Sequence, residues 1–188
     1  LNHFLAAAFL HDGGNPPFTH LAESFMRKLI GHNGESYLRE IVTGTKTEKI
    51  LKLYGIPLDE IMRLVMGETP ESKIIHGSMD CDNLDNITRY AVNAKIPVPL
   101  LDPLGIARAF SWNGTEWRLG AEVEDKAHDW QTARAAVYGF IYEGEDLPAY
   151  ILLERALDFA QETNELRPEF FRLNEAEAVE YLREECNP

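Results

Sequence analysis

Apolar residues recur at intervals of three and four along most of this chain, the spacing that places side chains on one face of an α-helix. Glycine and proline separate the segments that carry this pattern. The first helix is expected to bury a face made of Leu1, Phe4, Leu5, Ala8 and Phe9. Further helices are predicted over residues 21–30, 36–42, 48–54, 59–66, from 78 or 80 to 94, over 129–142 and 148–161, and up to 182.

Local signals mark the ends of several predicted helices. Gly13 and Gly14 are expected to end the first helix, because glycine accepts the left-handed conformation of a C-terminal cap. Gly31 is expected to end the second helix. Asn174 and Glu177 have the spacing of a capping box, in which each side chain bonds a backbone amide of the other residue. They predict the start of the last helix.

One stretch changes from helical spacing to alternation. Phe110, Trp112 and Trp117 alternate with other residues around Asn113-Gly114, which is the strongest short signal for a β-hairpin. With a two-residue turn, Phe110 would face Trp117 on an apolar, packed face. The fold class that the sequence predicts is therefore mostly α, with one β-hairpin.

Composition narrows the class of protein. With 45% hydrophobic and 26% charged residues the chain resembles an ordinary folded protein, and no apolar run approaches the roughly 20 residues that span a bilayer. The net charge of −13 argues against nucleic acid as a partner, since a phosphate backbone requires a basic face. Cys81 and Cys186 make no disulfide framework, which favours a reduced, cytoplasmic setting.

Candidate chemistry lies at two places in the chain. His11 and Asp12 are adjacent at the end of the first predicted helix, where both can bind one transition-metal ion. Alternatively, the histidine simply suits the negative end of a helix dipole. Asp82 and Asp85 lie one helical turn apart, with Arg89 four residues further on, which puts two carboxylates and a cation on one stripe. The alternative there is a solvated acidic face.

The stretch around the His-Asp pair resembles the core motif of the HD superfamily, specifically its deoxynucleoside triphosphohydrolase branch, with the pattern His-Asp-x-Gly-His-x-Pro-Phe-x-His. The matching positions are His11, Asp12, Gly14, Pro17, Phe18 and His20. Residues 31–36 resemble the family's His-Asn-x-x-Ser segment, and residues 78–89 its Asp-x-Asp-x-x-Asp-Tyr helix. More faintly, residues 130–142 are similar to its Arg…Tyr…Tyr helix.

The resemblance implies a role for each matched residue. The metal ligands would be His11, Asp12 and Asp82, holding iron, manganese, nickel, zinc or magnesium. His32 would act as general acid or base, oriented by Glu23. Positions that face the substrate are His20, Asn15, Asn86 and Tyr90. Local alternatives stay open: His20 as a cap of the Pro-Phe turn, His32 as a helix-terminal residue and Glu23 as an exposed helix residue.

Three departures from the family pattern bear on the function. The family's first metal histidine lies on an earlier helix, and only residues 1–10 precede His11 here. Asn15 stands where the family has a catalytic histidine, although asparagine cannot shuttle protons. Asn86 and Tyr90 replace the tyrosine and aspartate that hold the deoxyribose.

The sequence therefore predicts a metal-dependent phosphohydrolase acting on a phosphate ester or anhydride in a small substrate, a nucleotide by resemblance. The alternative is a catalytically degenerate HD-fold binding or assembly module. One HD-type domain is expected over 1–188, with a metal-site core at 1–100, the hairpin and C-terminal helices at 101–188, and the first helix or helices missing. By analogy the chain forms homo-oligomers, with Trp112 and Trp117 on an exposed hairpin as a candidate contact surface.

Overall fold

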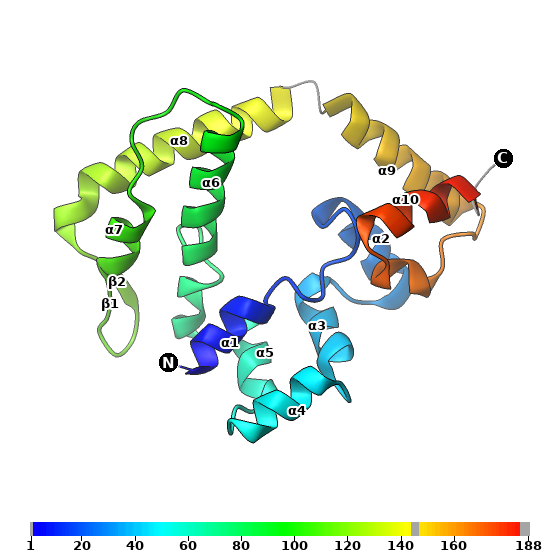
Figure 1. The fold of residues 1–188 in the computed structure, drawn as a ribbon, viewed down its shortest axis with the longest axis horizontal. Coiled ribbons are helices and arrows are strands. Elements are labelled where there is room, and N and C mark those ends of the chain that lie inside the picture. The colour runs from blue at the N-terminus through cyan, green and yellow to red at the C-terminus, as the bar shows by residue number, and fades with distance from the viewer. Residues whose placement is uncertain (1, 144–146, 185–188) are drawn as a thin grey trace. The chain divides into compact units, whose positions relative to one another are not determined.

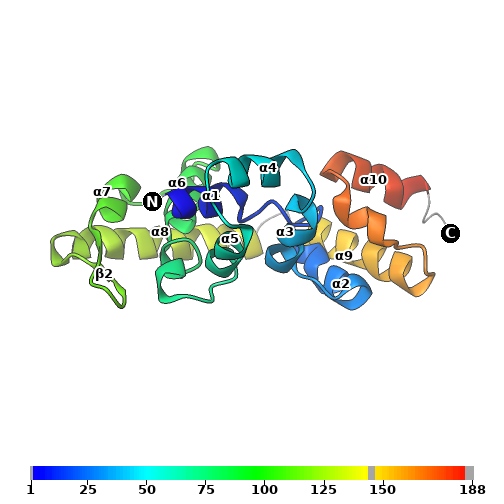
Figure 2. The same ribbon diagram turned by 90° about the horizontal axis from the view of Figure 1, so that it is seen from below.

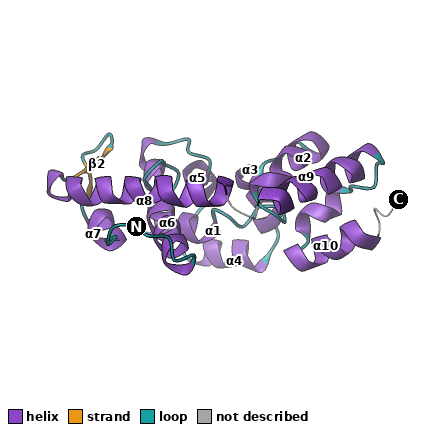
Figure 3. Cartoon of the chain, turned by 90° about the horizontal axis from the view of Figure 1, so that it is seen from above, coloured by secondary structure: helices purple, strands orange, loops and turns teal. Residues whose placement is uncertain are grey.

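A computed structural model describes residues 2–143 and 147–184 of the chain, so Leu1 and Cys186 lie outside the described residues. The described chain is mostly helical with one two-stranded antiparallel hairpin, which confirms that part of the prediction (Figures 1 and 3). The helices are α1 (Asn2–Leu10), α2 (His20–Ile30), α3 (Gly34–Val42), α4 (Lys46–Leu53), α5 (Leu58–Val65), α6 (Cys81–Asn93), α7 (Pro103–Arg108), α8 (Glu124–Glu143), α9 (Leu147–Glu162) and α10 (Glu175–Glu184).

Shorter elements complete the chain. They are the 3-10 helices η1 (Pro70–Ile74), η2 (Ala121–Val123) and η3 (Pro168–Arg172), and the strands β1 (Phe110–Trp112) and β2 (Trp117–Leu119). Within the described ranges, no helix is both long enough and apolar enough to cross a membrane.

The chain divides into two compact units. The first is residues 1–62 together with 148–188, and the second is residues 63–147. This division differs from the expected border near residue 100, because the last helices belong with the first ones. That the whole chain is one HD-type domain stays a prediction.

The core of the first unit is built from side chains of α2, α3, α9, η3 and α10, and Figure 2 labels the four α-helices among them. Phe25 and Met26 of α2 are buried there, and Phe170 of η3 packs its ring against Tyr181 of α10. The apolar spacing of α2 places one face on this core, and Gly31, with a positive φ of 76°, caps the helix as predicted.

The core of the second unit lies between α6, α7 and α8. It consists of Leu84, Ile87, Ala91, Ile106, Trp130, Ala133 and Val137. Asp80 is the N-cap of α6, and its carboxylate accepts hydrogen bonds from the backbone amides of Asn83 (2.7 Å) and Gly77 (2.8 Å). This cap fixes the start of α6 at one of the two places that the sequence predicted.

The predicted buried face of α1 is wrong. Ala7 is fully buried, whereas Phe9 is 88% exposed and Leu5 is 52% exposed. Every position from 4 to 10 is apolar, so periodicity does not single out one face of this helix.

The role predicted for the two glycines after α1 is also wrong. Neither Gly13 nor Gly14 has a positive φ, so neither is a left-handed cap. Gly14 instead permits a close approach of the chain to α3: a Cβ atom built there would lie less than 3.0 Å from the carbonyl oxygen of Gly34 and from the amide nitrogen of Leu38.

The hairpin forms, but its register differs from the prediction. Phe110 lies opposite Leu119, and Trp112 lies opposite Trp117 with 5.4 Å between the ring centroids. The side-chain oxygen of Asn113 accepts hydrogen bonds from two backbone amides of the loop, which lengthens the turn beyond two residues.

Both tryptophans of the hairpin are half-buried, which corrects the prediction of an exposed pair. The indole nitrogen of Trp117 donates a hydrogen bond of 2.8 Å to the carbonyl oxygen of Glu71 in η1. The hairpin is thus tied to the segment that leads into α6.

The sequence pattern also missed α7, a helix of six residues that begins at a proline. Pro103 occupies the first turn, where its missing N–H costs no hydrogen bond. Asp102 caps the helix by accepting from the amide of Gly105 (2.8 Å), and it also binds Lys126 (2.6 Å). Lys126, and then the Gly105 amide, hold the pKa of Asp102 below its usual range.

This depressed pKa predicts a pH-dependent stability difference for Asp102→Asn, which keeps the capping oxygen but removes the charge. A lowered folded-state pKa stabilises the fold above the unfolded pKa of about 3.9, and this stabilisation disappears as the pH falls through the folded value. We expect the variant to melt below wild type at pH 7, and the difference to shrink below about pH 4. Lys126→Gln should show the same pH dependence in thermal melts. A lowering of the melting temperature that is equal at pH 7 and below about pH 4 would contradict this electrostatic origin.

Candidate metal centre

His11 lies just after α1, in a turn. Its Nδ1 atom is 2.8 Å from the carbonyl oxygen of Ala8. Because a carbonyl oxygen can only accept, this contact assigns the ring hydrogen to Nδ1. In the neutral ring the Nε2 atom then carries the lone pair, which is the state of a metal-binding histidine held by a backbone carbonyl.

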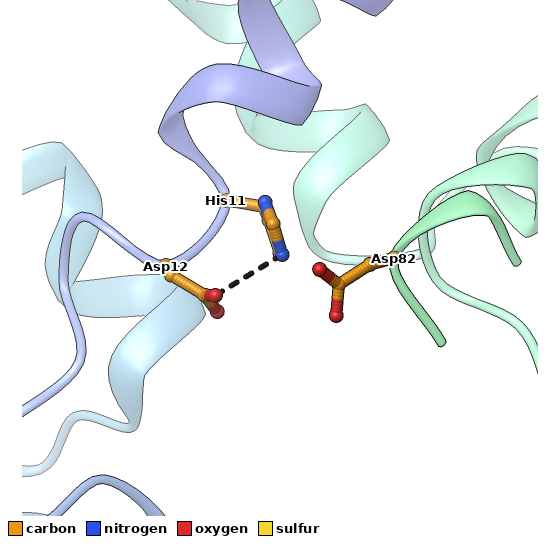
Figure 4. Close-up of side chains that lie close together, drawn as sticks. All are labelled: His11, Asp12 and Asp82. Atoms are coloured by element: carbon orange, nitrogen blue, oxygen red, sulfur yellow. Dashed lines mark ion pairs between the residues drawn. The ribbon is translucent and has the colours of Figure 1, made fainter. Parts of the chain in front are cut away.

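The Nε2 atom of His11 lies 3.2 Å from Oδ2 of Asp12, the pair that Figure 4 marks with a dashed line. In the tautomer with its hydrogen on Nδ1, the Nε2 lone pair faces this carboxylate oxygen, an arrangement that a bound cation would stabilise. Two ligand atoms bound to one ion at about 2.1 Å are separated by about 3.0–3.4 Å at octahedral to tetrahedral angles. The spacing of this pair therefore fits a shared ion.

The loop that follows holds Asp12 in place. Asn15 donates from Nδ2 to Oδ1 of Asp12 at 2.9 Å, and its backbone amide donates to the Asp12 carbonyl at 3.0 Å. The other end of the Asn15 amide rests on Gly34, where a Cβ atom would lie less than 3.0 Å from the Asn15 oxygen. Glycine at 14 and 34 thus lets this loop dock on the start of α3.

Glu23 holds the start of α3, and its predicted role of orienting His32 stays a prediction. Its Oε1 atom accepts from the backbone amide of Gly34 at 3.0 Å, and its Oε2 atom is 3.4 Å from Nδ1 of His20. The first amides of a helix have no partner within the helix, so they attract a carboxylate. His20 is 88% exposed at its side chain.

His32 has a different partner. Its Nδ1 atom lies 3.2 Å from the hydroxyl oxygen of Ser36, and its ring centroid is 5.7 Å from that of Tyr37. Asn33 and Ser36 form a capping box at the start of α3. The His-Asn-x-x-Ser segment therefore has a local structural function: it begins the helix and orients the histidine.

The third predicted ligand, Asp82, lies in the first turn of α6 and belongs to the second unit. Its Oδ2 atom accepts from Nδ2 of Asn86 at 2.7 Å. Arg89 donates from Nη2 to Oδ1 of Asn86 at 2.7 Å and from Nε to Asp85 at 2.6 Å. The predicted stripe of two carboxylates and one cation is confirmed, with the cation paired to Asp85.

A hollow of about 380 Å³ follows Asp82 along α6. Its lining consists of Asn86, Arg89, Tyr90, Asn93 and Ala94. The ring of Tyr90 meets the edge of Phe140 from α8, with 6.3 Å between centroids. Both residues predicted on α6 to face a substrate therefore line one hollow.

On α8, side chains four residues apart form a stack. The guanidinium of Arg134 lies 4.9 Å from the ring centroid of Tyr138, which stacks on Tyr142 at 5.9 Å. Within the described residues, Nε of Arg134 is buried and has no hydrogen-bond partner.

Sequence reasoning missed that Asn15 and Asn86 are hydrogen-bond donors to the two aspartates. The available signal was spacing: an asparagine three residues after Asp12, and another four residues after Asp82. The family resemblance does not indicate these contacts, because the family has other residue types at both positions.

Comparison with known proteins gives a partial relative. No family model matches the chain. The chain is similar to the uncharacterized protein MJ1154 of Methanocaldococcus jannaschii, with 30% identity over 105 residues. The match covers 56% of this chain and 21% of that protein, so the chain spans about a fifth of the relative's length.

Proposed function

We propose that this chain is a metal-dependent phosphohydrolase with an HD-type helical fold, acting on a phosphate ester or anhydride of a nucleotide. The observation that carries the proposal is the geometry of His11. Its Nδ1 hydrogen is committed to the Ala8 carbonyl, and its Nε2 atom stands 3.2 Å from a carboxylate oxygen of Asp12. A divalent ion bound between these two atoms would be coordinated by both of them.

By the resemblance, the residues that would hold the ion are His11, Asp12 and Asp82, which offer one nitrogen and two oxygen ligand atoms. This donor set suits iron, manganese, nickel or zinc, and tolerates magnesium. Such an ion, when bound, polarises a phosphoryl oxygen and lowers the pKa of a bound water.

Other residues of the chain supply the remaining functions. His20, whose side chain is exposed, is proposed to contact phosphate. His32, with its ring oriented by Ser36, is proposed as the general acid or base. The hollow beside Asn86 and Tyr90 is proposed to receive the sugar or base of the substrate.

A second candidate function is a binding or assembly module that retains the fold without catalysis. Asn15 favours it, because its amide donates to Asp12 and cannot transfer a proton. A module of this kind would bind metal or nucleotide and release no phosphate.

Metal content tests the proposal. The full chain, produced with iron and manganese present, is compared by elemental analysis with Asp82→Ala and with Asp85→Ala as the matched control one turn along α6. We expect about one transition-metal ion per chain in wild type and in Asp85→Ala, and a loss in Asp82→Ala and in His11→Ala. Nucleotides are then screened for phosphate release.

The outcomes separate the candidates. Metal together with nucleotide hydrolysis supports the phosphohydrolase. Metal or nucleotide binding without phosphate release supports the binding module. Absence of metal from the wild-type chain, or metal retained in both His11→Ala and Asp82→Ala, overturns the proposed site.

A further inference from the structure

We infer that an asparagine amide positions each of the two aspartates proposed as metal ligands: Asn15 positions Asp12, and Asn86 positions Asp82. The inference rests on the proposed function, because it concerns how the proposed ligands are oriented. Both asparagines are then positioning residues. The side-chain amide of Asn86 donates its hydrogen bond to a carboxylate of the protein, that of Asp82.

The first pair lies in the loop after α1. Asn15 donates to Oδ1 of Asp12 at 2.9 Å, and Oδ2 of the same carboxylate is the atom that lies beside Nε2 of His11. One oxygen therefore fixes the rotation of the carboxylate while the other faces the histidine. The contact of Asn15 with Gly34 fixes the amide in turn.

The second pair repeats this arrangement on α6. Asn86 donates to Oδ2 of Asp82 at 2.7 Å, and Arg89 donates to the Asn86 oxygen at 2.7 Å. The amide is thereby oriented with its NH₂ group toward Asp82, because its oxygen already accepts from a cation.

A neutral amide has a specific advantage in this position. It orients a carboxylate without adding a positive charge that would repel a divalent ion, as a lysine or arginine would. Its NH₂ group donates hydrogen bonds but does not act as an acid or a base. Outer-shell hydrogen bonds of this kind typically change metal affinity by about 10–100-fold.

The inference is tested without using activity by titrating the metal-free full chain with Mn²⁺ in a calorimeter, which measures the affinity for the ion. Asn86→Leu removes the donor at an exposed position while keeping a side chain of similar branched shape. Asn93→Leu is the matched control, because Asn93 is exposed on the same helix, lines the same hollow and lies beyond reach of Asp82. Asn86→Gln retains an amide that can reach an aspartate four residues away. Asn15→Ala tests the first pair.

We expect Asn86→Leu and Asn15→Ala to bind Mn²⁺ about tenfold more weakly, and Asn93→Leu and Asn86→Gln to bind within about threefold of wild type. Thermal melts should show an unchanged midpoint for both Asn86 variants. If the wild type binds Mn²⁺ and Asn86→Leu binds equally well, the inference is wrong and the metal site stands. If wild type binds no Mn²⁺, the proposed function fails and the inference fails with it.

Discussion

Replacing Gly14 with alanine is expected to lower the free energy of unfolding by about 3 kcal/mol, because the new methyl group has no space. A Cβ at this position lies less than 3.0 Å from the backbone of Gly34 and Leu38, and neither backbone atom can rotate away as a side chain could. The loop carrying His11 and Asp12 must then separate from α3. Guanidinium denaturation followed by far-ultraviolet circular dichroism measures the change.

Gly139→Ala is the matched control for this prediction. Gly139 lies inside α8, and a Cβ built there has no neighbour within 4 Å. Alanine should raise the free energy of unfolding by about 0.5–1 kcal/mol, the difference in helix propensity. If Gly14→Ala proves as stable as wild type, the loop does not approach α3 as closely as described.

The second large effect is expected at Asp80. Asp80→Ala should lower the free energy of unfolding by about 2–3 kcal/mol, because it removes the N-cap of α6 and leaves backbone amides of Gly77 and Asn83 without their acceptor. Asp80 is only 4% exposed, so water cannot fully replace the carboxylate. Tryptophan fluorescence, to which Trp130 contributes from the core against α6, follows this unfolding.

Two variants distinguish the loss of the N-cap hydrogen bonds from the loss of a negative charge. Asp80→Asn retains an oxygen that can accept from a backbone amide, so it should lose no more than about half of the effect of alanine. Asp85→Ala removes an exposed carboxylate from the same helix and should change stability by less than about 0.5 kcal/mol. Equal losses for Asp80→Ala and Asp85→Ala would show that helix charge, rather than capping, determines stability here.

Most helices could be predicted from the sequence because their borders carry local chemical signals. Gly31 takes a left-handed conformation after α2, and Asn174 and Glu177 form the predicted capping box before α10. These signals act within a few residues, so no knowledge of the rest of the fold is needed. The same holds for Asp80 before α6.

The sequence pattern failed where a contact distant in sequence decides the structure. The need for glycine at 14 arises from α3, which packs against the loop from outside its own segment. In the hairpin, the Asn113 side chain competes for loop amides and shifts the pairing to Trp112 with Trp117. The uniform apolar sequence of α1 carries no directional information about which face is buried.

The sequence identifies the candidate residues of the site, but not all of their contacts. The motif identified His11 and Asp12 together, and the structure places them in contact. It could not give the partner of Glu23, because the free amides at the start of α3 compete for that carboxylate. Nor could it indicate that Asn15 contacts Asp12, which depends on the turn that the loop adopts.

The contact between His11 and the Ala8 carbonyl also links the folding of α1 to the chemistry of the site. Carbonyl groups in the last turn of a helix have no partner inside it, and here the histidine ring satisfies one of them. This hydrogen bond places the ring proton on Nδ1, so the lone pair of the neutral ring is on Nε2, the atom that faces Asp12. When the last turn of α1 frays, the imidazole therefore loses the hydrogen bond that holds its ring and places its proton on Nδ1.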